Sequence, residues 1–232
     1  GQDGGDCPET GVNSGAAGQP VRPQRMDQSV FQKMIKSSSR VADLVSSPER
    51  VDQKTRNVLL PTAARAALVE AAHLAAERRL AAGTLAELSQ RLAGDRFAIT
   101  AREVWFPGLT EDDFNVISVS SGRVLLENPP AARHAEWHRA VYRLTGAGAV
   151  LLCQPLAAFK AAARPVTLNP DLAPVMAGLR WCEPDEAAIA AAVPFSSALL
   201  LTGCGLLVWG ANFREAAGLA ESIEFCLQAQ AD

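Results

Sequence analysis

The sequence predicts a mixed α/β domain in which short strands pair locally and antiparallel, with helices packed beside them. Alanine-rich stretches with helical spacing alternate with short runs of β-branched and bulky apolar residues. Turns rich in glycine and aspartate separate the strand candidates of residues 96–126, which favours antiparallel pairing between neighbours. Of the 232 residues, 48% are hydrophobic and 20% are charged, a composition that is typical of a globular protein.

The N-terminal part of the chain differs from the rest in composition. Residues 1–25 are rich in Gly, Pro, Gln and Ser and nearly lack large apolar side chains, so they cannot offset the entropy cost of ordering, and a flexible tail is predicted. Residues 26–60 carry apolar side chains at spacings of one, three and four, which predicts a helical extension with one or two short helices before residue 46. The predicted domain is residues 61–232.

Within this domain the elements follow from spacing and turn residues. A long helix is predicted from Pro61 to about Ala82, with Thr62 as its cap and Gly83 as its stop. The first strands are predicted at residues 96–100, 115–119 and 123–126. The remaining predicted elements are a helix at 135–144, a strand at 148–154, a helix at 156–163, a strand at 166–168, a helix at 184–192, strands at 198–201 and 206–209, and a helix at 212–229.

Charge, hydropathy and cysteine usage exclude several classes of function. The net charge is −3 and the basic residues are scattered, so binding to nucleic acid or to an anionic membrane surface is not expected. No apolar run approaches the ~20 residues of a spanning helix, so we expect a soluble domain without direct membrane insertion. Five cysteines without CxxC spacing predict neither a zinc finger nor a disulfide framework, and therefore a reducing compartment such as the cytoplasm or an organelle matrix.

Two segments carry a family resemblance. Residues 142–154, YRLTGAGAVLLCQ, and residues 197–210, SALLLTGCGLLVWG, closely resemble segments of the class II aldolase/adducin head domain superfamily. The first is similar to the strand that delivers a zinc-binding His-x-His, and the second to a strand, His-Gly turn and strand. The resemblance spans about residues 62–229, and the residues of the two segments are most similar to those of methylthioribulose-1-phosphate dehydratases. It implies a three-layer α/β/α fold with a central, mostly antiparallel sheet flanked by helices.

The resemblance also implies a zinc site, but the side chains at its positions differ from the family's. Family members hold zinc with three histidines and use it to polarise a carbonyl or to stabilise an enediolate. The corresponding positions here are Leu152, Gln154 and Cys204. Leucine has no donor atom, and a glutamine carbonyl oxygen is a poor zinc ligand, so we expect no metal and no other cofactor.

The other functional positions of the family differ as well. The phosphate loop corresponds to residues 83–89, which lack two glycines needed for a backbone amide cradle, and Glu87 would repel a phosphate dianion. Residues 101–103, Ala-Arg-Glu, replace a Pro-Ser-Gly motif. The acid/base position falls near Pro170 and Asp171, so Asp171 is the remaining candidate for a catalytic base.

A rebuilt metal site is an alternative. His134 and His138 lie four residues apart, which places both on one helix face, and together with Cys204 they could bind zinc. Cys153 should miss such a site because neighbouring strand side chains point to opposite faces. We favour a different interpretation, in which the two histidines belong to a surface turn at a helix start and the cysteines at 153, 204 and 226 are small buried apolar residues.

The sequence therefore predicts a non-catalytic aldolase-like protein with a structural or interaction role, as a subunit of a homo-oligomer or a larger complex with other protein subunits. Adducin's head is a non-enzymatic member of the superfamily, and enzyme members are typically tetramers, so the resemblance is compatible with this role. The alternative is a divergent zinc-dependent sugar-phosphate aldolase, epimerase or dehydratase. A third possibility is a sensor that binds a small polar molecule in the old cleft.

Overall fold

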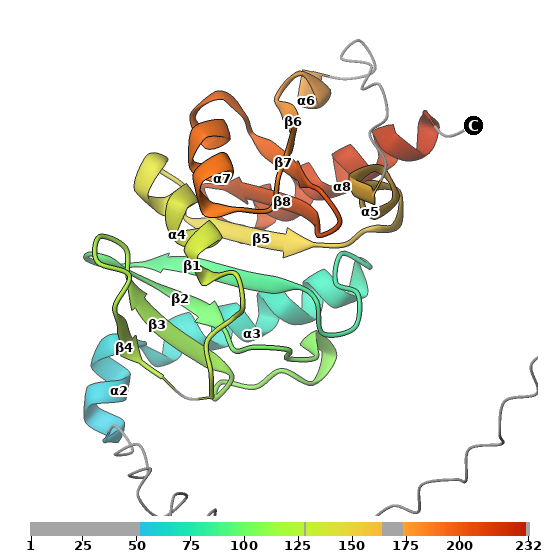
Figure 1. Cartoon of the computed structure of the whole chain (residues 1–232). Helices are drawn as coiled ribbons and strands as arrows, with labels where there is room; N and C mark the ends of the chain where they lie inside the picture. The colour runs from blue at the N-terminus through green and yellow to red at the C-terminus, as the bar shows by residue number, and fades with distance from the viewer. Residues whose placement is uncertain (1–51, 128, 164–173, 231–232) are drawn as a thin grey trace, which may run out of the picture. The chain divides into compact units, whose positions relative to one another are not determined.

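The computed structural model describes residues 52–127, 129–163 and 174–230 (Figure 1). They belong to a compact unit that spans Val51–Asp232. Four predictions from the sequence lie outside the described residues: the tail of residues 1–25, the short helices before residue 46, the strand at 166–168 and the candidate base Asp171.

The described strands form one eight-stranded sheet with the order β4-β3-β2-β1-β5-β8-β7-β6. Neighbouring strands are antiparallel except β6 and β7, which are parallel. The mostly antiparallel sheet implied by the resemblance is thus confirmed. The strands are β1 (Glu87–Leu92), β2 (Arg96–Thr100), β3 (Phe114–Ser118), β4 (Val124–Leu126), β5 (Ala149–Cys153), β6 (Leu179–Cys182), β7 (Ala198–Leu201) and β8 (Gly205–Gly210).

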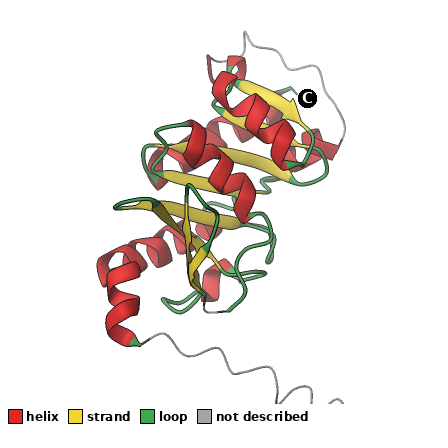
Figure 2. Cartoon of the chain, turned by 60° about the vertical axis from the view of Figure 1, so that its left-hand side comes forward, coloured by secondary structure: helices red, strands yellow, loops and turns green. Residues whose placement is uncertain are grey.

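Helices cover both faces of the sheet, which makes three layers (Figure 2). In Figure 1, α4 and α7 lie in front of the sheet, and α3 and α8 lie behind it. Helix α5 packs beside α8 and against β8. The helices are α2 (Gln53–Leu59), α3 (Thr62–Glu77), α4 (Ala135–Leu144), α5 (Leu156–Ala163), α6 (Pro174–Ala177), α7 (Glu186–Ala192) and α8 (Phe213–Ala229), with the 3₁₀ turns η1 (Phe106–Gly108) and η3 (Val193–Phe195).

The two faces of the sheet contribute to two separate cores, because neighbouring strand side chains point to opposite faces. In β5, Leu151 and Cys153 belong to the rear core, together with apolar side chains of α3, α5 and α8. Val150 and Leu152 belong to the front core, together with apolar side chains of α4 and α7. The prediction that Cys153 points away from Leu152 is confirmed.

Helix α3 is shorter than the sequence predicts. It ends at Glu77 rather than near Ala82, because Arg79 adopts the left-handed conformation with φ of 57°. The amide of Arg79 donates to Ala76 O at 3.0 Å and that of Leu80 donates to Ala75 O at 2.9 Å, the hydrogen-bond pair of a Schellman motif. Leu80 is buried in the rear core, and this burial holds the turn, so the stop predicted at Gly83 is wrong.

The start of α3 also differs from the prediction. The N-cap residue is Pro61, not Thr62, and it makes no side-chain cap. The Thr62 hydroxyl instead accepts a hydrogen bond from Arg65 Nη2 at 2.9 Å. Arg65 pairs with Glu111 at 3.2 Å, and Arg56 of α2 pairs with Asp112 at 2.7 Å. These ion pairs attach α2 and the start of α3 to the loop before β3.

Strands β1 and β6 were not predicted. Strand β1 takes up residues 87–89 of the segment that resembles the phosphate loop, whereas residues 83–86 form a turn. The front side of β1 consists of polar residues that bind α4, so β1 lacks the apolar alternation that marks a strand. Strand β6 is short and pairs in parallel with β7.

In the part of the chain that the structure describes, no single helix is long and apolar enough to cross a membrane, although α2 and α3 together, with a bend of 66°, pass that test.

Candidate functional site

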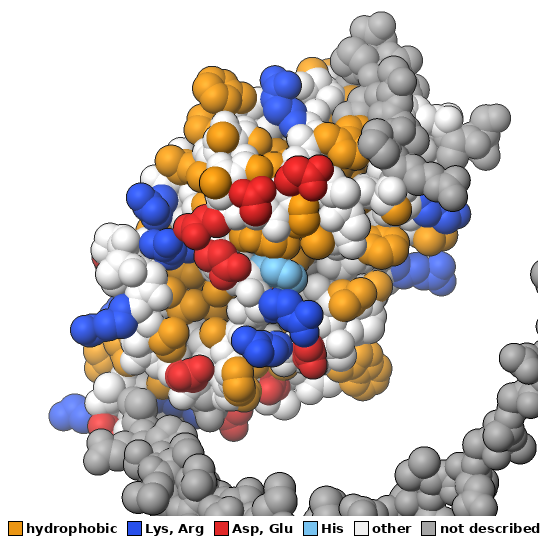
Figure 3. Space-filling view, in the orientation of Figure 1, with side chains coloured by type: hydrophobic (Ala, Val, Ile, Leu, Met, Phe, Trp, Pro, Cys, Tyr) orange, Lys and Arg blue, Asp and Glu red, His pale blue; other side chains and the backbone are white. Residues whose placement is uncertain are grey.

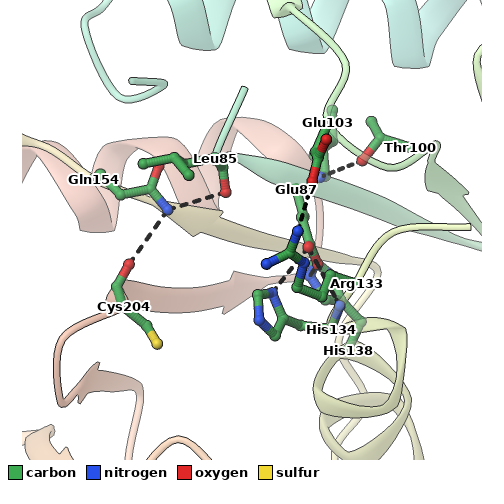
Figure 4. A network of polar contacts seen from close by, with 10 residues as sticks. Leu85, Glu87, Thr100, Glu103, Arg133, His134, His138, Gln154 and Cys204 are labelled. Atoms are coloured by element: carbon green, nitrogen blue, oxygen red, sulfur yellow. Dashed lines mark hydrogen bonds and ion pairs between the residues drawn. The ribbon is translucent and has the colours of Figure 1, made fainter. Parts of the chain in front are cut away.

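The fold brings the three positions of the implied zinc site together at one end of β5. Leu152 is in the strand, Gln154 follows it, and Cys204 lies in the turn between β7 and β8. The Gln154 amide nitrogen donates to Cys204 O at 3.4 Å and to Leu85 O at 3.2 Å (Figure 4). Leu152 is 1% exposed and packs in the front core. The position assignment made from the sequence is therefore spatially consistent.

These three side chains do not form a donor set for zinc. Leu152 offers no lone pair, and Gln154 uses its amide nitrogen on backbone carbonyls. Burial, and secondly the charge of Glu87, raise the pKa of the Cys204 thiol, which favours the thiol over the thiolate that zinc binds. A buried amide oxygen on Gln154 is the one further donor at these positions, and it is a weak ligand for zinc.

Next to these positions, Glu87 of β1 faces the start of α4. Its register partner in β5 is Leu152, so the two side chains lie on the same face of the sheet. The backbone N–H of His134 donates to both carboxylate oxygens, at 3.2 and 3.3 Å, and the His134 ring nitrogen Nδ1 lies 2.9 Å from Oε1 (Figure 4). Glu87 is only 6% exposed. The carboxylate is thus held by one residue through two groups.

Two residues further along β1, Ser89 binds the same helix. Its hydroxyl lies 2.7 Å from His138 Nδ1 and 2.9 Å from the Tyr142 hydroxyl. A serine hydroxyl can donate one hydrogen bond and accept another, so Ser89 can satisfy both side chains. All three side chains are buried. His138 Nε2 lies 3.7 Å from Glu87 Oε2, too far for a hydrogen bond.

A third residue of β1, Arg91, completes the series at the other end of α4. Its Nε donates to Ala147 O at 2.8 Å, and Nη2 donates to the carbonyls of Tyr142 and Thr145. The guanidinium also lies 4.9 Å from the centre of the Tyr142 ring. Arg91 therefore fixes the end of α4 and the turn that leads into β5.

Glu87, Ser89 and Arg91 are alternate residues of β1, and we call their contacts with α4 the β1–α4 polar ladder. Two strand residues span roughly 6.6 Å and four helical residues about 6 Å, so the two series stay in step. The spacing of His134, His138 and Tyr142 by four residues contains this signal in the sequence. His134 and His138 were considered from the sequence as alternative metal ligands and, by preference, as part of a surface turn, whereas the roles of Ser89, Arg91 and Tyr142 were not predicted.

Burial controls the charge states within the ladder. Burial lowers the pKa of His138 from its ordinary value of 6.5 to about 4, against the opposing effect of Glu87, so the ring is neutral at pH 7. Burial also raises the pKa of Tyr142 far above its ordinary value, which keeps its hydroxyl protonated. The middle of the ladder is therefore uncharged, and charge is confined to its two ends.

The candidate metal ligands are not arranged as a metal site. Among the described residues, no group of three His, Cys, Asp or Glu side chains is placed to hold a metal ion. The predicted surface turn is wrong for His138, which is fully buried because it faces Ser89. The prediction that Cys204 is buried is also wrong, since the β7–β8 turn leaves it partly exposed, whereas Cys153 and Cys226 are buried as predicted.

The rim of this site is charged. His134 keeps 24% of its side chain exposed. On the face that α4 and α7 cover, Figure 3 shows histidine at the surface between basic side chains below and acidic side chains above. The neighbouring residue Arg133 pairs with Glu103, which has a left-handed backbone with φ of 58°. Glu103 lies in the turn that replaces the Pro-Ser-Gly motif, so this turn is tied to the start of α4.

Most of the chain matches a known protein family. Residues 66–231 match the family model described as Class II Aldolase and Adducin N-terminal domain. No curated protein matches the chain.

Solved structures with the same fold include sugar-phosphate aldolases. An L-fuculose 1-phosphate aldolase is 21% identical, with a TM-score of 0.68 over 75% of this chain and 87% of that one. L-Fuculose-1-phosphate aldolase from Thermus thermophilus is 26% identical, with a TM-score of 0.60 over 72% and 95%. A sugar-phosphate aldolase from Thermotoga maritima is 14% identical, with a TM-score of 0.62 over 71% and 91%. At such identities the likeness concerns the fold.

Proposed function

The chain belongs to the class II aldolase and adducin family, and we propose that it is a non-catalytic member with a structural or interaction role. The observation that carries the proposal is the filled site. A buried leucine, a glutamine bonded to two backbone carbonyls and a thiol with a raised pKa stand at the three implied zinc positions. Such side chains stabilise the local fold but are unsuited to hold the zinc ion that would act on a substrate as a Lewis acid.

The Glu87 carboxylate supports the same proposal. It stands within the segment that corresponds to the family's phosphate loop, residues 83–89, of which 83–86 form a turn here and 87–89 already belong to β1. A carboxylate near a bound phosphate repels it, and a regular strand uses its amides on its neighbours. Strand β1 pairs on both sides, with β2 and with β5. The part of the segment that lies in β1 therefore offers a sugar phosphate a carboxylate and paired amides instead of an amide cradle.

We further propose that the protein acts as a subunit of a homo-oligomer or of a larger protein complex. Large apolar side chains are exposed on several elements: Trp105 is 61% exposed, Phe195 72% and Phe225 72%. Exposed aromatic residues are enriched at protein interfaces. Trp181, in contrast, is half-buried and Phe106 fully buried, so these two pack within the domain.

Metal analysis of the purified full chain tests the absence of zinc chemistry. We expect less than stoichiometric zinc after purification in zinc-supplemented medium, and no rise in Tm with zinc or L-fuculose 1-phosphate. Stoichiometric zinc together with a phosphate-dependent rise in Tm would contradict the proposal.

A divergent zinc lyase is the second candidate. The observation that favours it is the proximity of Glu87 to both histidines, at 2.9 Å from His134 Nδ1 and 3.7 Å from His138 Nε2, with Cys204 near enough to feel the charge of Glu87. This candidate predicts zinc that is lost in both Cys204→Ala and His134→Ala, with retro-aldol or dehydration activity on a sugar phosphate. The first candidate predicts that neither substitution changes the metal content.

Light scattering coupled to size-exclusion chromatography tests the assembly role. We expect a mass above that of the 24.5 kDa monomer for the isolated chain or for the chain with co-purified proteins. Trp105→Ser and Phe225→Ser should lower that mass if their side chains lie in the interface, whereas the exposed Arg102→Ser serves as the control. A strictly monomeric chain that co-purifies with no protein would contradict the assembly role.

A further inference from the structure

The start of α4 has no cap of its own. His134 is the N-cap residue and makes no side-chain cap hydrogen bond within the helix. The Glu87 carboxylate from β1 instead accepts the His134 N–H at 3.2 and 3.3 Å and contacts its ring Nδ1 at 2.9 Å. The N-terminus of a ten-residue helix carries partial positive charge, which stabilises an anion there. Glu87 thus accepts the N–H of the N-cap residue, the hydrogen bond that a Glu at the third helical position supplies in a capping box, but from another strand.

The surroundings of this carboxylate leave it few partners. Glu87 is 6% exposed, and a carboxylate buried to this extent is costly unless it is hydrogen-bonded. The titratable groups that face it are His134 and His138 of α4 and Cys204 of the β7–β8 turn. Among the described residues no Lys or Arg pairs with it, since the adjacent Arg133 pairs with Glu103. Its negative charge is therefore held by the helix start and by imidazole.

A second observation marks the place as one that accepts an anion. His138 Nε2 is a fully buried polar atom without a hydrogen-bond partner in the described residues, and it lies 3.7 Å from Glu87 Oε2. Since Ser89 occupies Nδ1, the neutral ring can carry its proton on Nε2, toward the carboxylate. A backbone N–H, a ring nitrogen of His134 and Nε2 of His138 therefore converge on one carboxylate.

We propose that Glu87 is a built-in anionic ligand: its carboxylate occupies an anion site made by the start of α4 and two imidazoles, latches α4 to β1, and excludes free anions. Removing the carboxylate opens this site to a small anion from solution. The latch is independent of the proposed function, because it concerns the attachment of α4 and holds whether or not the protein binds a partner.

Substitution in the full chain tests the latch. Glu87→Ala removes the carboxylate, and we expect Tm to fall by on the order of 10 °C, because buried donors lose a charged acceptor. Glu103→Ala is the matched control, since it removes a neighbouring carboxylate that pairs with Arg133 on the surface, where both side chains are about 60% exposed. We expect its Tm to change by no more than about 2 °C. Equal effects of the two substitutions would overturn the proposal.

Chemical rescue tests the anion site itself. Sodium formate, acetate or inorganic phosphate, compared with sodium chloride at equal ionic strength, should raise the Tm of Glu87→Ala saturably by several degrees, and should leave wild type and Glu103→Ala at their chloride values. Rescue by formate and acetate alone would limit the site to carboxylates, and rescue by phosphate as well would extend it to larger anions. If no anion restores Tm, or if wild type responds equally, the proposal is wrong.

Glu87→Gln covers the case in which the alanine variant does not fold. The amide keeps the shape of the side chain but removes the charge and places a donor near the His134 N–H. Hydrogen exchange should then be about tenfold faster or more at the amides of residues 134–138, with smaller changes in α8 on the opposite face. Unchanged exchange at the start of α4 in this variant would show that the carboxylate does not hold the helix.

Discussion

Behind the sheet, α3, α5 and α8 pack against alternating apolar side chains, whereas in front β1 holds α4 through the β1–α4 polar ladder. Both arrangements bury strand side chains, but they differ in the substitutions that they tolerate. An apolar core loses stability in proportion to the volume removed. A buried polar network loses it whenever one partner is missing, because the remaining groups cannot reach water. The attachment of α4 to β1 should therefore tolerate fewer substitutions than the rear core, and its stability should depend more on pH.

The apolar face should give the largest loss for a single side chain. Leu151 of β5 is fully buried in the rear core. Leu151→Ala should lower the free energy of unfolding by about 2–5 kcal/mol, because it removes buried apolar volume and leaves a cavity. Urea unfolding followed by circular dichroism measures this loss. Leu156→Ala is the control, since Leu156 is 64% exposed and its replacement should change stability by less than about 0.5 kcal/mol.

The β1–α4 polar ladder should respond to pH through His138. Its folded-state pKa, lowered by burial to about 4, lies below the ordinary value of 6.5, so the unfolded chain takes up the proton first as the pH falls. The contribution of neutral His138 should be fully present above pH 6.5 and be lost progressively between pH 6.5 and 4. The loss is about 3–4 kcal/mol once both the unfolded and the folded chain are fully protonated, since each pKa unit corresponds to about 1.4 kcal/mol.

His138→Asn isolates this pH effect from that of the carboxylates. Asparagine keeps a polar atom for Ser89 but does not titrate, so the difference in unfolding free energy between wild type and variant should shrink as the pH falls from 7 to 4. Urea unfolding at several pH values provides the curves. A difference that stays constant over this range would show that His138 takes up its proton equally in both states.

Removing the middle of the ladder should have a smaller effect. Ser89→Ala leaves His138 Nδ1 and the Tyr142 hydroxyl without their shared partner, and we expect a loss of about 1–3 kcal/mol. The matched control is Ser222→Ala on α8, where an exposed hydroxyl bonds to Gly218 O and water can replace it. Its effect should stay within about 0.5 kcal/mol. Similar values for the two serines would contradict the difference between the faces.

Elements with strong local signals were predicted closely from the sequence. The bounds of β2, α4, α5 and β7 coincide with the predicted ranges, and Asn212 caps α8 as the first residue of the predicted helix suggests. In each case apolar periodicity, a turn or a cap residue lies within the segment itself. The end of α3 was missed because Leu80 is drawn into the rear core, a contact that the helix sequence does not contain.

The positions of the candidate site could be predicted from the sequence, but the contacts of its side chains could not. The positions Leu152, Gln154 and Cys204 could be found because the resemblance fixes their order along the chain. The contacts of these side chains could not be found, because the hydrogen bonds from Gln154 to Leu85 O and Cys204 O depend on where two turns meet. Likewise His138 and Ser89 are 49 residues apart in the chain and meet only when α4 packs on β1.

The sequence by itself determined the α/β class, most elements and the replacement of the implied zinc ligands, since each depends on residue type at a known place in the chain. The tertiary structure alone decided that β1 is a strand, that Glu87 serves the start of α4 and that His138 is buried and neutral. The physical reason is that burial and partners across the sheet set the state of a polar side chain, and both arise only when distant segments pack together.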